Sequence, residues 1–230
     1  MSSGKGANAV AVAEHAFALM LGLARRIVPA ATSVAEGRWE KSRLGGIGLR
    51  GKTLGIVGFG SIGTEIARIA SAMGMNVVVA PSTVQDPRND SRRAAIEGLP
   101  CATEASSLVE ALELSDFVSV QLPLTEGTRD LIGRAELSSM KPSGILVSVG
   151  RGGVVNEAAL LDSLRGRDIY GAALDVFVNE GPRDMPADET LMKLAALDST
   201  IITPHIGGHT GEAQEEVWNR VVENALDALR

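Results

Sequence analysis

The chain has 230 residues, of which 45% are hydrophobic and 22% charged, a composition typical of a globular protein with a sizeable core. Its formal net charge of -6 argues against non-specific nucleic-acid binding, because such binding needs a basic face that displaces counterions. A single cysteine, Cys101, excludes an intrachain disulfide and a cysteine-based zinc site, and we expect no metal site of another kind. The low cysteine content also favours a reducing compartment, so we expect a cytoplasmic protein.

The first apolar segment covers residues 7–24 and has enough hydrophobic residues to suggest a signal peptide or a membrane span. Glu14 and His15 interrupt it, and Arg25 and Arg26 follow it directly. Its apolar residues recur at helical spacing, which predicts a packed amphipathic helix. We therefore expect no association with a membrane.

Short β-branched runs alternate with helical patterns after a Gly-rich connector of mixed charge at residues 36–51. The expected strands are 53–57, 76–80, 117–121, 144–149, 170–176 and 200–203. The expected helices are 61–73, 106–113, 135–140, 156–165, 189–196 and 212–229. Residues 80–103 are polar and contain prolines, so we expect a long loop there with one short strand near Cys101.

The expected strands are apolar on both faces, as in residues 145–149, and this pattern is typical of a parallel sheet covered by helices on both sides. Alternating strands and helices of this kind predict a doubly wound α/β fold of the Rossmann type. We expect one dinucleotide-binding domain over residues 1–230. Residues 1–50 form its helical lead-in and connector, 51–208 its core and 209–230 its C-terminal helix.

Three glycines, Gly58, Gly60 and Gly63, form a G-x-G-x-x-G pattern that follows the first buried strand and opens a helix. Glycine turns are common, but this context favours a dinucleotide site. The first glycine permits a tight turn, the second lets the backbone approach a pyrophosphate, and the third lets the helix pack closely on the sheet. The helix N-terminus supplies free N–H groups and a partial positive charge for the phosphates.

An acid at the end of the second strand would bind the adenosine ribose diol, but this chain has none there. Ser82 stands nearby and can bond a ribose hydroxyl without repelling a 2′-phosphate, whereas the nearest acid downstream is Asp86. Arg88, Arg92 and Arg93 lie close enough in sequence to help bind such a phosphate, although a solvated charged loop also accounts for them. The sequence therefore predicts NAD as cofactor and leaves NADP open.

Three further motifs follow expected strands, at the edge where open α/β sheets bind their ligands. They are Ser148-Val-Gly-Arg-Gly-Gly-Val-Val155, Ala173-Leu-Asp-Val-Phe-Val-Asn-Glu180 and Thr203-Pro-His-Ile-Gly-Gly-His209. Taken singly, Arg151, Glu180 and His205 have structural explanations, as a surface ion pair, a solvated acid and a capped loop histidine. Together they suit the reduction of a 2-oxo acid. The arginine can bind the carboxylate, the histidine can protonate the alkoxide, and the glutamate can orient the imidazole and favour its protonated form.

In this ordered set of motifs the chain resembles the D-isomer-specific 2-hydroxy-acid dehydrogenases, which include phosphoglycerate, glyoxylate and hydroxypyruvate reductases. The resemblance runs from Gly6-Ala-Asn-Ala-Val-Ala-Val-Ala-Glu-His15 to the last helix. It implies an oxidoreductase in which Arg151 binds substrate, Glu180 orients the imidazole and His205 is the acid/base. It also implies a set of residues near the cofactor besides the glycines and Ser82. That set is Ser61, Ile62, Leu122, Pro123, Thr128, Val149, Arg151, Asp175, His205, Gly207 and Gly208, with Asp175 on the nicotinamide carboxamide.

The resemblance further implies a homodimer paired through the first helix, whose apolar face would be exposed. Members of the family begin with a substrate lobe that closes over the cleft, and this chain begins at the helix that follows it. We therefore expect a substrate lobe that is largely missing and a protein that binds dinucleotide but turns over slowly. Family members usually have Glu-Pro where this chain has Glu180 followed by Gly181.

The alternative is a non-catalytic dinucleotide sensor of the same family, in which cofactor binding changes association with a protein partner. A short-chain dehydrogenase is excluded, because it needs Tyr-x-x-x-Lys and the only tyrosine, Tyr170, is followed by Gly-Ala-Ala-Leu174.

Overall fold

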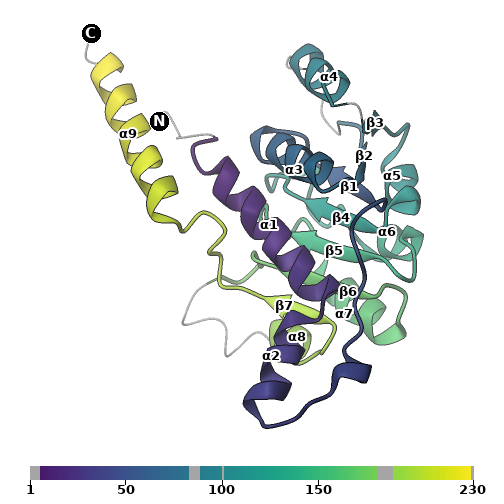
Figure 1. The fold of residues 1–230 in the computed structure, drawn as a ribbon. Coiled ribbons are helices and arrows are strands. Elements are labelled where there is room, and N and C mark those ends of the chain that lie inside the picture. The colour runs from purple at the N-terminus through teal and green to yellow at the C-terminus, as the bar shows by residue number, and fades with distance from the viewer. Residues whose placement is uncertain (1–5, 83–88, 100, 181–188, 229–230) are drawn as a thin grey trace.

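The computed structural model describes residues 6–82, 89–99, 101–180 and 189–228. Their strands form one seven-stranded sheet, parallel throughout, in the order β3-β2-β1-β4-β5-β6-β7 (Figure 1). The strands are β1 (Thr53–Val57), β2 (Asn76–Val79), β3 (Ala102–Glu104), β4 (Phe117–Val120), β5 (Ile145–Ser148), β6 (Gly171–Leu174) and β7 (Thr200–Ile202). This order is that of a doubly wound fold, so the predicted fold class is confirmed.

Helices cover both faces of the sheet. They are α1 (Ala9–Ala24), α2 (Ile27–Ala35), α3 (Ser61–Ala72), α4 (Asn89–Glu97), α5 (Leu108–Leu114), α6 (Arg134–Ser139), α7 (Glu157–Gly166), α8 (Glu189–Ala195) and α9 (Gly211–Ala228), with a 3₁₀ turn at Lys41–Arg43. Alternation along the strands explains the two layers. In β2, Val77 and Val79 join a core cluster with α1 and α3, whereas Val78 joins a second cluster with α5 to α8.

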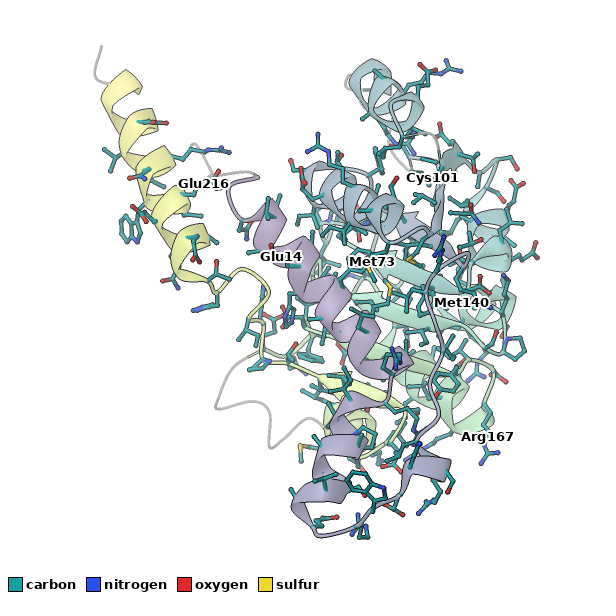
Figure 2. All side chains as sticks on the ribbon, in the orientation of Figure 1. Glu14, Met73, Cys101, Met140, Arg167 and Glu216 are labelled. Atoms are coloured by element: carbon teal, nitrogen blue, oxygen red, sulfur yellow. The ribbon has the colours of Figure 1, made fainter. Side chains whose placement is uncertain are left out.

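Helix α1 lies in the core, against α3 and the sheet. Its side chains at Ala13, Ala16 and Met20 are fully buried, and exposed positions such as Glu14 alternate with them (Figure 2). The expectation that this helix exposes an apolar face is therefore wrong, because α3 and strands β5 to β7 cover that face. Among the described residues no single helix is long and apolar enough to cross a membrane, and α1 and α2 reach that length only as a pair bent by 63°.

Two segments depart from the predicted elements. The loop expected at residues 80–103 contains α4, whose sequence is mostly polar, while the strand expected near Cys101 is confirmed as β3. Helix α2 was not predicted, because only Ser33 of its nine residues is buried. The other predicted strands and helices are confirmed within about two residues at their ends, a normal margin for such boundaries.

The C-terminal helix α9 projects away from the sheet (Figure 1), and Figure 2 shows Glu216 on it. Among its described side chains, Ala213 alone is buried. The carboxyl ends of the parallel strands meet at one edge of the sheet. The strand order reverses between β1 and β4, and open α/β sheets bind ligands at such a switch point.

Candidate active site

The glycine turn lies at the switch point between β1 and β4. Gly58 has φ +103°, which favours glycine, and a β-carbon added to it would lie 3.0 Å from Leu122 Cδ2, just beyond β4. A β-carbon on Gly63 would overlap the carbonyl oxygen of Gly58. At Gly60, by contrast, a β-carbon would meet no atom within 4 Å. The turn therefore has the tight bend, the close helix packing and the open backbone that a pyrophosphate requires, and Ser61 begins helix α3 beside it.

Gln121 holds this turn in place and was not predicted from the sequence. Its Nε2 donates to the carbonyl oxygens of Val57 at 3.0 Å and Gly58 at 2.7 Å, and its Oε1 accepts from Ser119 at 2.8 Å. The side chain is buried, so these bonds satisfy its amide. The sequence offered one signal of this role, because Gln121 is a polar residue at the end of an otherwise apolar expected strand, directly before the predicted cleft residue Leu122.

The end of β2 lacks an acid that would bind a ribose, and an arginine of α4 lies there instead. Arg92 of α4 donates to the carbonyl oxygen of Ala80 at 2.7 Å and pairs with Glu104 at the end of β3. Its side chain is only 14% exposed, so the interpretation as a solvated loop residue is wrong for Arg92. That interpretation fits Arg93, which makes an exposed ion pair with Glu97. Ser82 is exposed at this edge, and Asp86 and Arg88 lie outside the described residues.

The predicted cleft residues differ in accessibility. Pro123 is exposed and Leu122 partly buried beside the glycine turn, while Val149 is 5% exposed after β5. Thr128 is 3% exposed, and its hydroxyl donates to Pro123 O at 2.6 Å and accepts from Thr125 N at 2.8 Å. Thr128 therefore shapes the loop after β4, and its direct contact with a cofactor stays a prediction. Ile62 is partly buried in the first turn of α3.

Glu180 and His205 meet at the carboxyl edge, as predicted. Glu180 follows β6 and His205 follows β7, and Glu180 Oε2 lies 2.7 Å from His205 Nδ1. The other oxygen of Glu180 accepts from Phe177 N at 3.0 Å, which fixes the carboxylate. Nδ1 therefore carries a proton towards the carboxylate, and Nε2 is the ring nitrogen left for a substrate. Both side chains are exposed, at 35% and 43%, so a small molecule can reach them.

Arg151 stands on the neighbouring turn after β5. Its side chain is exposed and donates to its own chain at Gly150 O, 2.7 Å away. A β-carbon on Gly152 would overlap the carbonyl of Phe177, so this turn packs directly on the segment that leads to Glu180. The structure therefore brings the three predicted catalytic residues to one edge, with Glu180 and His205 in contact and Arg151 on the turn after the neighbouring strand β5.

Glu157 bonds to the segment between β6 and Glu180 and was not predicted as a site residue. It begins α7, is 9% exposed, and its Oε1 accepts from Val178 N at 2.8 Å. Nothing in the sequence marked this carboxylate, because acids in a first helical turn are common.

Asp175 is a buried carboxylate that bonds to the turn carrying His205. Its Oδ1 accepts from Thr203 Oγ1 at 2.6 Å and Ile206 N at 2.9 Å, and its Oδ2 accepts from Gly207 N at 2.8 Å. His15 Nε2 of α1 lies 3.3 Å from Oδ1. Burial disfavours the charged carboxylate, but the hydrogen bonds, with that of His15 the strongest, outweigh it and hold the pKa of Asp175 below its usual value. The predicted contact between Asp175 and a nicotinamide carboxamide stays a prediction.

The turn after β7 has little room for other side chains. A β-carbon on Gly207 would lie 2.9 Å from Asp175 Oδ2, and one on Gly208 would lie 2.7 Å from Asn8 Nδ2. Both glycines were predicted as cofactor residues. Gly207 is required by the close packing of the Asp175 carboxylate, and Gly208 by that of Asn8 at the start of α1.

No group of three or more His, Cys, Asp or Glu side chains is arranged to hold a metal ion in the part of the chain that the structure describes. A dinucleotide fits better, because the open space at Gly60 lies at the start of α3 and on the same edge as Arg151, Glu180 and His205.

Comparisons with known proteins agree with this geometry. Residues 17–207 match the family described as D-isomer specific 2-hydroxyacid dehydrogenase, NAD binding domain. The hydroxypyruvate reductase of Thermotoga maritima is 41% identical over 97% of this chain and 68% of its own length. The D-3-phosphoglycerate dehydrogenase of Methanocaldococcus jannaschii is 38% identical over 97% of this chain, which spans only 40% of that relative.

A solved glyoxylate reductase from Paecilomyes thermophila superposes with a TM-score of 0.83 at 33% identity, covering 97% of this chain and 63% of that structure. The match to the family covers most of the chain, including the glycine turn and His205. The chain belongs to the D-isomer specific 2-hydroxyacid dehydrogenases and carries their NAD binding domain.

Proposed function

We propose that this chain binds NAD and reduces a small 2-oxo acid to the corresponding D-2-hydroxy acid, or runs the reverse oxidation. The bound dinucleotide would supply or accept the hydride. The glycine turn and the start of α3 would hold its pyrophosphate. The nicotinamide end would then lie towards the turns after β5, β6 and β7, which carry Arg151, Glu180 and His205.

The observation that carries the proposal is the contact between His205 Nδ1 and Glu180 Oε2, at the same edge as the open glycine turn. With Nδ1 engaged, His205 presents Nε2 to the substrate and can protonate the oxygen that gains charge as hydride adds to the carbonyl carbon. Glu180 stabilises the positive charge of the imidazolium. The guanidinium of Arg151 would bind the carboxylate of the substrate through two parallel hydrogen bonds.

The relatives bear the names of reductases and dehydrogenases, so a non-catalytic sensor is not favoured. Their names also define the substrate panel, which is hydroxypyruvate, glyoxylate and 3-phosphohydroxypyruvate. We propose NAD as the preferred dinucleotide. Arg92 at the end of β2 is the residue that would tolerate the 2′-phosphate of NADP.

Calorimetric titration with NADH and NADPH, followed by steady-state assays over that panel, tests the function. We expect NADH to bind and at least one 2-oxo acid to be reduced. Arg151→Ala should still bind NADH but lose reduction. Absence of NADH binding would refute the dinucleotide site. Binding without any reduction over the panel would refute the catalytic assignment.

We also propose that the chain forms a homodimer, through α2 and the segment after it. Trp39 is 84% exposed there, and Ile27, Val28 and Val34 are each more than half exposed. Exposed apolar groups of this size usually mark an interface. Light scattering should give twice the chain mass, and Trp39→Ser should shift it towards one chain. A single-chain mass for the unmodified protein would contradict the dimer.

A further inference from the structure

His15 lies on α1, 188 residues before Thr203 in sequence, yet the two side chains meet beneath the turn after β7. Its Nε2 is 3.1 Å from Thr203 Oγ1 and 3.3 Å from Asp175 Oδ1. The imidazole is 17% exposed and the Asp175 side chain 2%. The described helix α1 therefore delivers a polar group into a buried site, which its otherwise apolar packing does not require.

The hydrogen bonds decide which ring nitrogen carries the proton. Thr203 Oγ1 donates to Asp175 Oδ1 at 2.6 Å, so its only proton is used and it can act towards His15 only as an acceptor. Asp175 is a carboxylate and also accepts. Nε2 of His15 must therefore bear a hydrogen, shared between the hydroxyl and carboxylate oxygens.

Asp175 transmits this contact to the next turn. Its two oxygens accept from the backbone N–H groups of Ile206 and Gly207, the two residues that follow His205. His205 itself has φ +54°, a left-handed conformation that costs free energy in any residue other than glycine. The neighbouring backbone bonds to Asp175 hold that conformation, and it is in this conformation that Nδ1 of His205 reaches Glu180.

We propose that His15 is a positioning residue for His205. It fixes the Asp175 carboxylate, and the carboxylate fixes the left-handed turn that aims the His205 ring at Glu180. The inference rests on the proposed function of His205, since a fixed ring matters only if that ring transfers the proton. It assigns the described part of α1 a role in the active site in addition to its packing against α3 and the sheet.

The ring of His205 reports directly on this role. The chain has three histidines, His15, His205 and His209, so the imidazole carbon-bound proton signals in an NMR spectrum can be assigned by single substitutions. Glu180→Ala gives the reference position of a His205 signal that has lost its partner. In His15→Phe, which keeps an aromatic ring but removes the donor, we expect the His205 signal to move towards that reference.

Activity should follow the signal. We expect kcat for the best 2-oxo acid to fall roughly 10- to 100-fold in His15→Phe, as small displacements of a catalytic group do, with a smaller change in KM for NADH. His15→Gln restores a donor at a similar reach, so it should return both the His205 signal and kcat most of the way. A second route to the same loss is Thr203→Val, which removes the bridging hydroxyl. Combined with His15→Phe it should add little, because the two act through one network.

Phe17→Leu is the matched control. Phe17 is a buried residue of the same helix that belongs to the apolar core cluster, and its shortening should lower the unfolding temperature without moving the His205 signal. If His15→Phe and Thr203→Val both leave the signal where Phe17→Leu leaves it, the positioning role is refuted. If the signal moves but His205→Ala retains full activity, the proposed function fails instead, and the two failures are thereby distinguished.

Discussion

Two aspartates, Asp175 buried and Asp116 partly buried, stand at opposite ends of the strands and are held in different ways. Asp116, at the amino edge before β4, accepts from Thr53 N at 2.9 Å and from Lys141 Nζ at 3.1 Å, with Lys52 at 3.9 Å. Asp175, at the carboxyl edge after β6, is held by a hydroxyl, two backbone N–H groups and an imidazole.

The difference separates stability from function. The partners of Asp116 are flexible lysine side chains and the start of β1, so its bonds join strand ends whose position does not depend on a ligand. Apart from His15 of α1, the partners of Asp175 belong to the loop that carries His205, so its bonds set the geometry of a turn. Ion pairs therefore stabilise the amino edge of the sheet, whereas directional hydrogen bonds set the geometry of the carboxyl edge, where the glycine turn lies.

Removal of His205 gives the largest expected effect and tests whether the carboxyl edge can lose function without losing stability. We expect His205→Ala to lower kcat/KM for the best 2-oxo acid by roughly 100- to 10,000-fold, the usual contribution of a general acid. The unfolding temperature should stay close to that of the unmodified chain, because the ring is exposed, and NADH should still bind. Steady-state kinetics and calorimetry measure both.

His209→Ala serves as the control, since His209 is exposed and contacts Gln214 outside the site. It should leave kcat unchanged. Equal losses in the two variants would remove the special role of the His205 turn.

Two residues of the glycine turn after β1, Gly60 and Gly63, allow a second comparison within the carboxyl edge. Gly60 has φ -100°, a conformation open to alanine, and open space around its missing side chain. Gly60→Ala should therefore fold normally but lose about tenfold or more in NADH affinity, equivalent to about 1.4 kcal/mol, because its methyl group fills the pyrophosphate position. Calorimetric titration and thermal unfolding give the two quantities.

Gly63→Ala should impair both folding and binding, because its methyl group would overlap the Gly58 carbonyl and displace α3. We expect a lower unfolding temperature together with weaker binding. If Gly60→Ala bound NADH normally, the pyrophosphate would have to lie elsewhere.

The sequence predicts local features of this molecule well and long-range ones poorly. Strands β1 and β5 were found because they are apolar on both faces, and Gly58, Glu180 and His205 because they belong to motifs that come after expected strands. Helix α4 was missed because its residues are mostly polar. Arg92 was taken for a loop residue because its partners, Ala80 O and Glu104, come together only when β2 and β3 pair.

His15 and Gln121 show the same limit inside the site. His15 was not predicted as a site residue, since no local pattern on an apolar helix indicates a contact with Thr203. Gln121 bonds to Val57 and Gly58, residues more than 60 positions away. Side chains that support a site act through tertiary contacts, and one sequence carries no direct signal of them.

Exchange of each aspartate for asparagine tests the comparison of the two edges itself. Asp116→Asn should reduce the free energy of unfolding by about 1–2 kcal/mol through its weakened bonds to Lys141 and Thr53, with kcat unchanged. Asp175→Asn should reduce both, because an amide nitrogen would face the N–H groups of Ile206 or Gly207. Chemical denaturation and steady-state assays separate the two. A normal kcat in Asp175→Asn would end the distinction between the edges.

Acid should weaken both edges, and this is the smallest expected effect. For Asp116, burial disfavours the charged form, but the bonds from Thr53 and Lys141 outweigh it and lower its pKa, as the bonds to Asp175 do for that residue. A depressed pKa means that the unfolded chain binds protons more readily, so the stabilisation is complete above the ordinary aspartate pKa of about 3.9 and is lost as pH falls below it. The unfolding temperature should therefore be flat from neutral pH to about pH 5 as far as these two groups decide it, and should then decline more steeply for the unmodified chain than for Asp116→Asn. Equal slopes in the two proteins would show that the lysine-bound carboxylate contributes nothing to stability, and the amino edge would then need another explanation.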